Sequence, residues 1–364
     1  MLVNHFLDSG TARSFSLTPS IGPEVHRLKL EELQGENFRR YPEPGKTTVY
    51  DDKQTLDIDN VPLNGSILVK TLLLSVDPYM RGKMRNCKIQ YYSEPYILGE
   101  PIYGLGIGKV LRSEHAEYKP GDYVYGMINF EEYAIPKRII NKVTLRPGLS
   151  LPVYLSPLGM MGKTAYYGWR EYSQAKKGEV AFVSGGAGPV GSFVIQLAKL
   201  DGMKVIASAG TDDKVKECKE VGADVAFNYK TIDTSEILRQ EGPLNVYWDN
   251  VGGPTLDTAL GATAHHARII VCGMVSEYNN QDGTHLKNLW AIYGRSLHIH
   301  GFLAFDLAPK WDAAFWKEVP PLVASGKLRH REDITKGLEN SGEAILEVQK
   351  GINFGKKIVL VAEE

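Results

Sequence analysis

The stretch Glu179-Val180-Ala181-Phe182-Val183-Ser184-Gly185-Gly186-Ala187-Gly188-Pro189-Val190-Gly191 decides the fold class of this chain. It opens with an apolar run typical of a buried β-strand, and apolar residues then recur at helical spacing over 190–198. Between the two, Gly186, Gly188 and Gly191 form a G-x-G-x-x-G motif. A strand, this motif and a helix in that order are typical of dinucleotide-binding folds, although a plain tight turn can use the same glycines.

The motif has the residues that phosphate binding requires. Glycines allow a tight turn and a close approach of the backbone to a pyrophosphate. The helix that follows offers free N–H groups and the positive end of its dipole. We therefore expect cofactor contacts along the whole turn, at Gly186, Gly188, Pro189, Val190 and Gly191.

Strand-like and helix-like segments alternate after this motif. Strands are expected at 204–209, 224–228, 244–248 and 268–272, and a helix is expected at 212–221. Such alternation indicates a doubly wound parallel sheet with helices on both faces. We therefore assign residues 151–319 to an α/β domain of the Rossmann type.

The end of the second expected strand favours NADP(H) over NAD(H). An enzyme that prefers NAD places a carboxylate there, about 20 residues after the glycine motif, but the sequence reads Ser208-Ala209-Gly210-Thr211. Lys214 follows and can meet a 2′-phosphate, or it is simply a solvated helix lysine. Asp212 and Asp213 are placed to cap the helix.

The chain before residue 150 has a different pattern of apolar residues. Short apolar runs separated by turns, at 66–70, 106–111 and 122–125, predict a mostly antiparallel β region. The polar, proline-bearing stretch 34–60 is interpreted as a long surface loop or insertion. A final apolar run at 357–361 is expected to return to this region as a strand. Residues 1–150 and 320–364 are therefore assigned to a second domain.

Composition excludes several classes of protein. The 364 residues include 42 Lys and Arg against 43 Asp and Glu, a net charge of −1, which argues against a nucleic-acid or acidic-membrane partner. No window approaches the roughly 18 unbroken apolar residues of a membrane span, and Asp8 interrupts the N-terminus before a signal region develops. Cys87, Cys218 and Cys272 are too few for a disulfide framework. We expect a cytoplasmic globular protein.

Six further motifs follow one another along the chain and point to a known family. They are LSVDPYMR (74–81), GMMGKTAY (159–166), FNYK (227–230), DNVGG (249–253), CGMVSEYN (272–279) and NFGK (353–356). Together with the glycine motif they resemble the zinc-independent medium-chain dehydrogenases/reductases. The nearest group is the leukotriene B4 12-hydroxydehydrogenase, prostaglandin reductase and alkenal double-bond reductase family. The resemblance covers about residues 60 to 364 and implies a Rossmann domain joined to a β-barrel-like (GroES-like) substrate domain.

The resemblance also implies a reaction. Hydride passes from NADPH to the β-carbon of an α,β-unsaturated aldehyde or ketone, and the enolate is protonated at the α-carbon. In the family a tyrosine stabilises or protonates this enolate, and the matching residue here is Tyr278. A phenol suits the role because its pKa of about 10 keeps it protonated at neutral pH, although on its own Tyr278 reads as an ordinary loop tyrosine. Tyr79 would face the substrate or lie in the barrel core.

The remaining implied roles are cofactor contacts. Lys214 and Tyr229 would hold the 2′-phosphate, and Asn250 would lie near the cofactor at the end of the fourth strand. The nicotinamide end would be lined by Cys272, Gly273, Ser276, Tyr278, Phe302, Leu303, Ala304 and Asn353.

The zinc ligands of zinc-dependent relatives find no match in the sequence. Asp77-Pro78-Tyr79 stands in place of the ligand cysteine, and 99–104 holds no histidine. His298 and His300 fall on one face of a strand, but no third ligand is apparent nearby. His265-His266 is interpreted as a polar loop between a helix and the fifth strand. We expect no metal.

Two further expectations concern partners and function. In the family the strand at 296–302 pairs with its two-fold mate, so we expect a homodimer, which would also cover an open sheet edge. A quinone reductase of the same fold stays open as an alternative. So does a non-catalytic NADPH-binding sensor, which would keep Lys214 but not need Tyr278. The motifs at 77–81 and 276–279 favour the enal or enone reductase.

Overall fold

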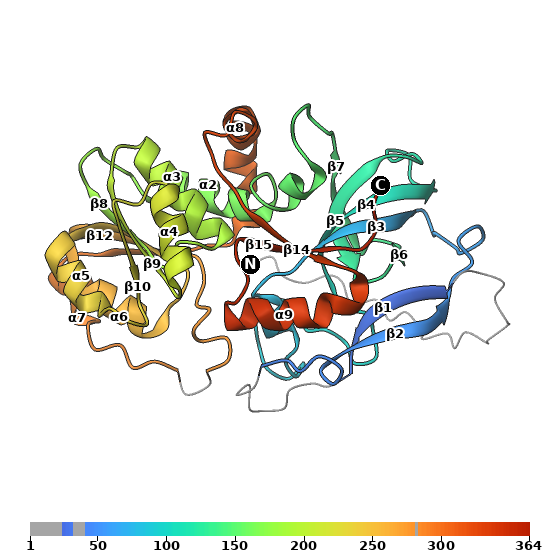
Figure 1. Ribbon diagram of the computed structural model, residues 1–364, viewed down its shortest axis with the longest axis horizontal. Coiled ribbons are helices and arrows are strands. Elements are labelled where there is room, and N and C mark those ends of the chain that lie inside the picture. The colour runs from blue at the N-terminus through green and yellow to red at the C-terminus, as the bar shows by residue number, and fades with distance from the viewer. Residues whose placement is uncertain (1–23, 32–40, 281–282) are drawn as a thin grey trace, which may run out of the picture.

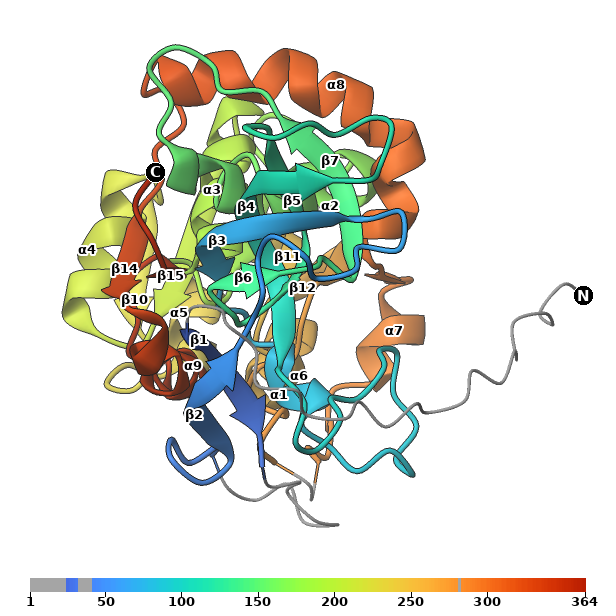
Figure 2. The same cartoon turned by 90° about the vertical axis from the view of Figure 1, so that its right-hand side faces the viewer.

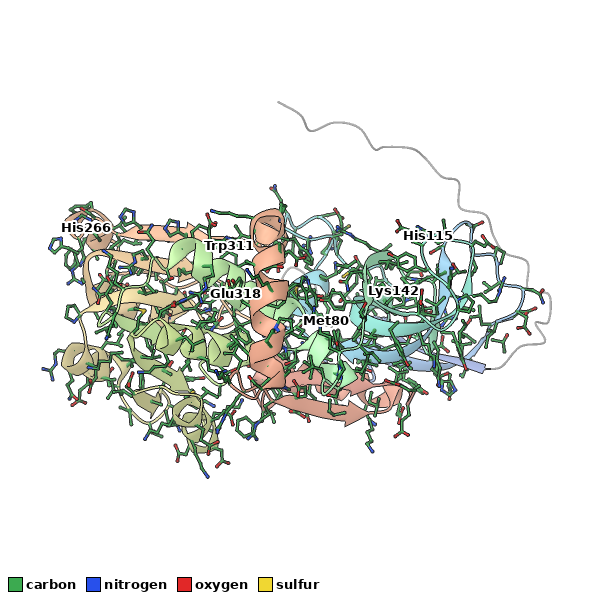
Figure 3. All side chains as sticks on the ribbon, turned by 90° about the horizontal axis from the view of Figure 1, so that it is seen from above. Met80, His115, Lys142, His266, Trp311 and Glu318 are labelled. Carbon is green, nitrogen blue, oxygen red and sulfur yellow. The ribbon has the colours of Figure 1, made fainter. Side chains whose placement is uncertain are left out.

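The computed structural model describes residues 24–31, 41–280 and 283–364, and two large sheets dominate it (Figure 1). One sheet has six strands and the other has seven. The long helix α8 (Ala304–Ala324) lies between the two halves in the view of Figure 3, with Trp311 and Glu318 directed toward the six-stranded half. Both side chains bond to α2 (Met160–Tyr172), since Tyr166 donates to Glu318 and Trp311 donates to Glu171.

The six-stranded sheet is parallel throughout and confirms the expected Rossmann fold. Its order is β10 (Val225–Asn228), β9 (Lys204–Ala209), β8 (Val180–Val183), β11 (Leu244–Asp249), β12 (Thr263–Val271) and β13 (His298–Gly301). Its helices are α2 and α3 (Pro189–Leu200), α4 (Asp212–Glu220), α5 (Thr234–Glu241), α6 (Gly253–Gly261) and α7 (Trp290–Gly294). The order reverses between β8 and β11, which is where such sheets bind ligands at their carboxyl ends.

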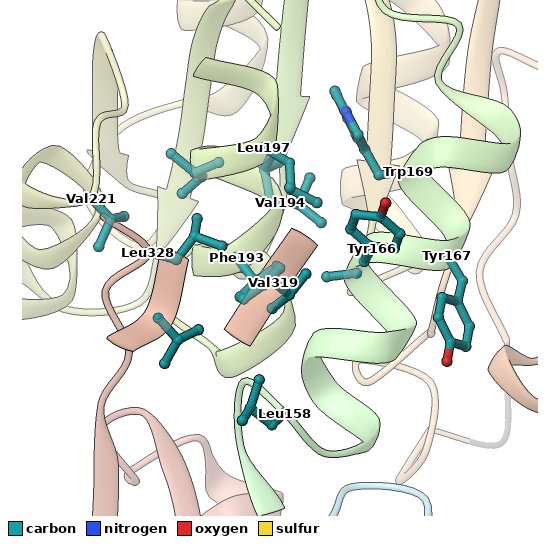
Figure 4. Packing of buried hydrophobic residues seen from close by; sticks show 14 of the residues in the cluster. Leu158, Tyr166, Tyr167, Trp169, Phe193, Val194, Leu197, Val221, Val319 and Leu328 are labelled. Carbon is teal, nitrogen blue, oxygen red and sulfur yellow. The ribbon is translucent and has the colours of Figure 1, made fainter. Parts of the chain in front are cut away.

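A continuous apolar core joins this sheet to the helices above it. Figure 4 shows Phe193 and Val194 of α3 beside Val319 of α8, with Tyr166 of α2 close by. Glycine at 168 allows α2 to approach the sheet, because a Cβ there would lie 2.4 Å from the ring of Phe302.

The seven-stranded sheet is mostly antiparallel and confirms the second half of the expected fold. Its order is β14 (Glu332–Lys336), β15 (Lys356–Leu360), β3 (Ile67–Ser75), β4 (Tyr103–Ser113), β5 (Tyr123–Asn129) and β7 (Arg138–Val143), and β6 (Tyr133–Ala134) pairs with β3. The last apolar run of the chain thus lies beside β3. The helix α9 (Ser341–Lys350) connects β14 to β15, and the short helix α1 (Met80–Lys83) follows β3.

The expectation of a loop over 34–60 is wrong over 48–55, whereas 41–47 and 56–60 form turns and irregular structure. β2 (Thr48–Thr55) pairs with β1 (Glu24–Leu30), and Figure 2 shows the two strands next to α9. The polar composition misleads because Asp51 forms an ion pair with Lys29 of the neighbouring strand, and that contact lowers the pKa of Asp51. Residues 34–40 of the stretch lie outside the described residues.

The expectation of a polar loop at His265-His266 is also wrong. Both residues belong to β12 and are exposed. The pairing of β11 with β12 shifts register between Thr263 and Arg268, so the intervening residues bulge outward. A bulge lets a strand continue through exposed polar residues.

A buried ion pair connects β15 to the segment that follows β3. Nζ of Lys356 lies 2.5 Å from Oδ1 of Asp77, and both side chains are 1% exposed. The ammonium also donates to the carbonyl of Val76 at 2.8 Å, and Ser75 donates to Oδ2 of Asp77 at 2.6 Å. Burial lowers the pKa of Lys356, although Asp77 opposes the shift. Every polar atom of the pair thus depends on a partner inside the protein.

We expect Lys356→Met to lower the free energy of unfolding by about 3–5 kcal/mol, because it leaves the Asp77 carboxylate buried without its cation. The double variant Lys356→Met/Asp77→Asn should be more stable than the single variant, since no bare charge then stays inside. Urea unfolding followed by circular dichroism measures both. A single variant as stable as the parent chain would contradict this account.

Candidate active site

The glycine motif forms the turn between β8 and α3. Gly188 caps the helix and Pro189 is its first residue, so the helix begins inside the motif. A Cβ on Gly191 would lie 2.4 Å from the carbonyl oxygen of Gly185, so only glycine lets the helix pack this closely on the turn. A Cβ on Gly186 would lie 3.0 Å from the Sγ of Cys218. The first-turn N–H groups that a helix leaves free therefore lie at the carboxyl end of β8, where a pyrophosphate fits.

The end of β9 gathers cations and a phenol. A Cβ on Gly210 would lie 3.3 Å from Oη of Tyr229 and 3.4 Å from Cε of Lys230. Burial lowers the pKa of Lys214, and the neighbouring Lys230 adds to the effect. Thr211 caps the helix by accepting the N–H of Lys214, so the capping role expected of the following aspartates falls to the threonine.

This group fits a 2′-phosphate, since Lys214 and Lys230 supply positive charge and Tyr229 a hydroxyl. Lys230 was not singled out from the sequence, although it directly follows Tyr229 in the FNYK motif. Lys214 also reaches across to the other half of the molecule, where its Nζ donates to the carbonyl of Gly351 at 2.7 Å. Gly351 ends α9 with φ of +62°.

The turn after β11 is organised by a buried carboxylate. Oδ1 of Asp249 accepts hydrogen bonds from the hydroxyl of Tyr247 at 2.7 Å and from the N–H groups of Val251 and Gly252 at 2.9 and 2.8 Å. Burial raises the pKa of Asp249, while these bonds oppose the shift. The carboxylate thereby fixes the backbone at the point where the sheet order reverses.

Asn250 lies at the end of β11, as expected, and its side chain is engaged within the protein. Its Nδ2 donates to the carbonyl of Ser184 at 2.7 Å, and its Oδ1 accepts from Nε1 of Trp248 at 3.1 Å. Asn250 therefore joins the carboxyl ends of β8 and β11.

The segment 272–280 follows β12 and carries Tyr278. It is anchored to the turn after β11, because Cys272 N–H donates to the carbonyl of Asp249 at 2.9 Å and Ser276 Oγ donates to that of Val251 at 2.7 Å. Oη of Tyr278 lies 3.5 Å from where a Cβ on Gly273 would sit. The sequence motif thus folds back on itself, with the phenol over its own glycine.

Burial raises the pKa of Tyr278 above its usual value, and the nearby Tyr92 and Tyr91 add to the effect. Burial also raises the pKa of Cys272 to about 12. Both groups therefore carry their protons at neutral pH, so Tyr278 can donate a proton and Cys272 is not a thiolate nucleophile.

Two tyrosines of the other half approach this segment, and a third lies next to them. The rings of Tyr91 and Tyr92 lie 4.6 Å apart between centroids, and Tyr92 is close enough to influence Tyr278. Tyr79 packs on the core of the seven-stranded half, where burial raises its pKa, and it also lies near Tyr92. The position of Tyr79 therefore has features of both expectations, a tyrosine of the barrel core and one that faces the substrate. Tyr91 and Tyr92 were missed because they belong to no motif.

The remaining residues expected to contact the cofactor differ in whether their side chains are already engaged within the protein. The ring of Phe302 packs inward, with its centroid 5.8 Å from those of Trp248 and Tyr172. Leu303 and Ala304 follow at the start of α8. Asn353 lies in the turn before β15, and its Nδ2 donates to the carbonyl of Gly355 at 2.8 Å.

Among the described residues, no group of three or more histidines, cysteines and carboxylates is arranged to hold a metal ion. The rings of His298 and His300 lie parallel with their centroids 6.5 Å apart, and His266 lies 6.4 Å from His298. No helix in the described part of the chain is long and apolar enough to cross a membrane.

Comparison with protein families matches two parts of the chain. Residues 189–319 match the model described as zinc-binding dehydrogenase, and residues 47–141 match the N-terminal domain of oxidoreductase. The second match begins at the start of β2, so the resemblance to known proteins extends further toward the N-terminus than the sequence motifs indicate.

Several curated proteins are similar over most of their length. The chain is 38% identical to a 2-alkenal reductase (NADP(+)-dependent) of Nicotiana tabacum, covering 87% of this chain and 95% of the relative. It is 38% identical to the (+)-pulegone reductase of Mentha piperita, over 83% and 89% of the two chains. It is 35% identical to the NADPH-dependent curcumin reductase of Escherichia coli, over 84% and 91%.

Solved structures share the architecture. CurA from Vibrio vulnificus in complex with NADPH superimposes with a TM-score of 0.82 at 29% identity, covering 93% of this chain and all of that one. Escherichia coli quinone oxidoreductase complexed with NADPH has a TM-score of 0.70 at 18% identity, over 92% and 99% of the two chains. The second likeness shows the fold alone.

We expect Lys214→Ala to weaken NADPH binding by about ten-fold or more and NADH binding far less, because a hydrogen bond to a charged group contributes about 1.5–3 kcal/mol. Titration of cofactor fluorescence measures both dissociation constants. Lys216→Ala is the matched control, since its side chain on the same helix is 77% exposed. Parallel losses for the two cofactors would mean that Lys214 does not recognise the phosphate.

Proposed function

Because this chain belongs to the medium-chain dehydrogenase/reductase family, in its alkenal reductase branch, we propose that it reduces the carbon–carbon double bond of α,β-unsaturated aldehydes and ketones. It is an NADP-dependent oxidoreductase. When bound, NADPH supplies the hydride that adds to the β-carbon. The proposal extends to this chain the chemistry in the names of its relatives, since alkenals, pulegone and curcumin all carry a conjugated carbonyl group.

The observation that carries the proposal is the half-buried, protonated hydroxyl of Tyr278 beside the turn after β11. Hydride addition places negative charge on the carbonyl oxygen of the substrate, and a preorganised donor stabilises that charge. Tyr278 would donate to this oxygen or deliver the proton that completes the reaction at the α-carbon. The raised pKa keeps the proton available across the neutral range.

The substrate side of the site would be formed by Tyr79, Tyr91 and Tyr92. Aromatic faces suit a flat conjugated system and exclude water from the enolate. Because these tyrosines lie in the seven-stranded half and Tyr278 in the other, the site would require both halves. This supports residues 1–150 and 320–364 as the substrate domain and 151–319 as the cofactor domain.

The cofactor would lie along the carboxyl ends of the parallel strands. The turn of the glycine motif would hold the pyrophosphate, and Lys214, Tyr229 and Lys230 the 2′-phosphate. The nicotinamide end would meet the segment from Cys272 to Tyr278, with Gly273 and Ser276, and the region of Asn250. Phe302, Leu303 and Ala304 would contribute through their backbone, and Asn353 would approach from the turn before β15.

We also propose a homodimer that forms through β13. This strand pairs with β12 at one side and is the last of its sheet. Large apolar side chains are exposed around it, including Ile299 at 43% and Trp290 at 46%. An open edge bordered by apolar surface is suited to pairing with a second copy. All three cysteines are free, which is consistent with the cytoplasmic location that we propose.

The direct test offers NADPH, and then NADH, with a panel of enals, enones and quinones, and follows the loss of reduced cofactor. We expect turnover with NADPH and enones, and a saturated carbonyl product by mass spectrometry. Faster reduction of quinones than of enones would favour a quinone reductase. Tight NADPH binding without turnover on any of them would favour the sensor.

We expect Tyr278→Phe to lower the rate of turnover by about ten-fold or more while NADPH affinity stays near normal, because only a transition-state contact is lost. Steady-state kinetics and cofactor fluorescence check the two statements. Tyr118→Phe in the other half is the control for loss of a phenol. Unchanged turnover in Tyr278→Phe would refute the assignment.

Ile299→Lys is expected to convert the dimer to a monomer, because a charge on the edge strand opposes edge-to-edge pairing. Light scattering after gel filtration gives the mass. Ile97→Lys, at a position 68% exposed in the other half, should leave the dimer intact. A parent chain that is monomeric at micromolar concentration would rule out this interface.

A further inference from the structure

Arg81 lies at the junction of the two halves with its side chain fully buried. It belongs to α1, two residues after Tyr79, and its Nε donates a hydrogen bond of 2.7 Å to Oδ1 of Asn279, 198 positions further along the chain. Asn279 directly follows Tyr278. Burial lowers the pKa of Arg81 to about 10, so the guanidinium keeps its charge at neutral pH. The contact is therefore a charge-assisted bond inside the protein, the stronger kind of hydrogen bond.

A second contact reaches the same asparagine from α9. Nδ2 of Asn279 lies 3.5 Å from Oε1 of Gln349, and Nε2 of Gln349 donates to the carbonyl of Pro78 at 3.2 Å. That carbonyl also accepts the backbone N–H of Arg81 at 3.1 Å. The four residues thus form a closed ring of hydrogen bonds that joins the segment after β3, the segment after β12 and α9.

We propose that Arg81 is a positioning residue for Tyr278, holding the phenol in place by fixing the side chain of the next residue, Asn279. The inference rests on the proposed reduction of enals and enones, in which Tyr278 meets the substrate. It assigns to Arg81 and Asn279 a role that the established dependence on NADP does not require.

The geometry of the segment explains why a bond at Asn279 is needed to hold Tyr278 in place. The start of the segment is anchored to the turn after β11, through the N–H of Cys272 and the hydroxyl of Ser276. Tyr278 comes later, and Arg81 fixes the chain one residue beyond it. Consecutive Cα atoms are about 3.8 Å apart, so a fixed Asn279 leaves the Tyr278 backbone little freedom. A misplacement of about 1 Å at a reacting group costs on the order of 100-fold in rate.

The bond between Arg81 and Asn279 also helps to set the distance between the substrate side, at Tyr79, and the side of Tyr278. Arg81 and Tyr79 are on the same short segment, and Asn279 and Tyr278 are neighbours. The bond between Arg81 and Asn279 therefore joins the segment that carries Tyr79 to the residue that follows Tyr278. Without it, the two sides would be joined at this point only through the longer contacts of Gln349 with Asn279 and Pro78.

The test is a double-mutant cycle on the full-length protein. Arg81→Met keeps a long apolar side chain in the buried position and removes the donor, and Asn279→Ala removes the acceptor from the other side. Each is made in the parent chain and in Tyr278→Phe. The measurement is the single-turnover rate of NADPH oxidation with a saturating enone, together with the NADPH dissociation constant. Asn280→Ala, one residue further along, is the matched control.

In the parent chain we expect Arg81→Met and Asn279→Ala to slow hydride transfer by about ten-fold or more, with NADPH affinity within about two-fold of normal. In Tyr278→Phe the same changes should cost less than about two-fold, because a residue that acts through the phenol has no further effect once the hydroxyl is gone. Asn279→Asp keeps an acceptor for the guanidinium and should recover most of the rate.

An equal loss in both backgrounds would overturn the inference, because Arg81 would then act independently of Tyr278. Unchanged rates in the single variants would overturn it as well. If Arg81→Met does not fold, the cycle of Asn279→Ala with Tyr278→Phe decides alone. A parent chain that oxidises no NADPH with enones would be a failure of the proposed function, which the parent measurement reveals separately.

Discussion

The buried ion pair between Asp77 and Lys356 holds together two segments of the seven-stranded half that reach the site. Neither charge can remain inside the protein without the other, because the loss of hydration is offset only by their mutual contact. Asp77 begins the segment that leads through Tyr79 to Arg81, and Lys356 ends the one that carries Asn353. This contact between distant parts of the chain thus joins the segment of Tyr79 to the turn that carries Asn353.

The cofactor side also depends on a buried carboxylate, that of Asp249. Its bonds to the backbone after β11 shape the turn from which Asn250 reaches β8, and the carbonyl of the same residue anchors the segment that carries Tyr278. The segment is anchored to Asp249 near its start and is bonded to Arg81 of the other half at Asn279. The phenol is therefore placed by the relation between the two halves, not by its own strand or helix.

The sequence is sufficient to predict the features that depend on neighbours in the chain. The local pattern of glycines and apolar residues predicts the turn at Gly186 to Gly191 and the parallel sheet. The absence of a carboxylate at the end of β9 can likewise be read from the sequence. The sequence cannot predict contacts between distant segments, and this explains the misses. The polar composition of β2 predicts a loop, because Asp51 gains its counter-ion Lys29 only from another strand. Tyr91 and Tyr92 come near Tyr278 only through the packing of the two halves.

The place of β15 in its sheet determines the order in which the two halves can be completed. β15 pairs with β3 on one side and β14 on the other, yet it is made only after every strand of the parallel sheet. During synthesis, which proceeds from the N-terminus, β3 keeps an unpaired edge and Asp77 lacks its cation until that point. The parallel sheet is continuous from β8 to β13 and can close first. The half that comes first in the sequence is therefore finished last.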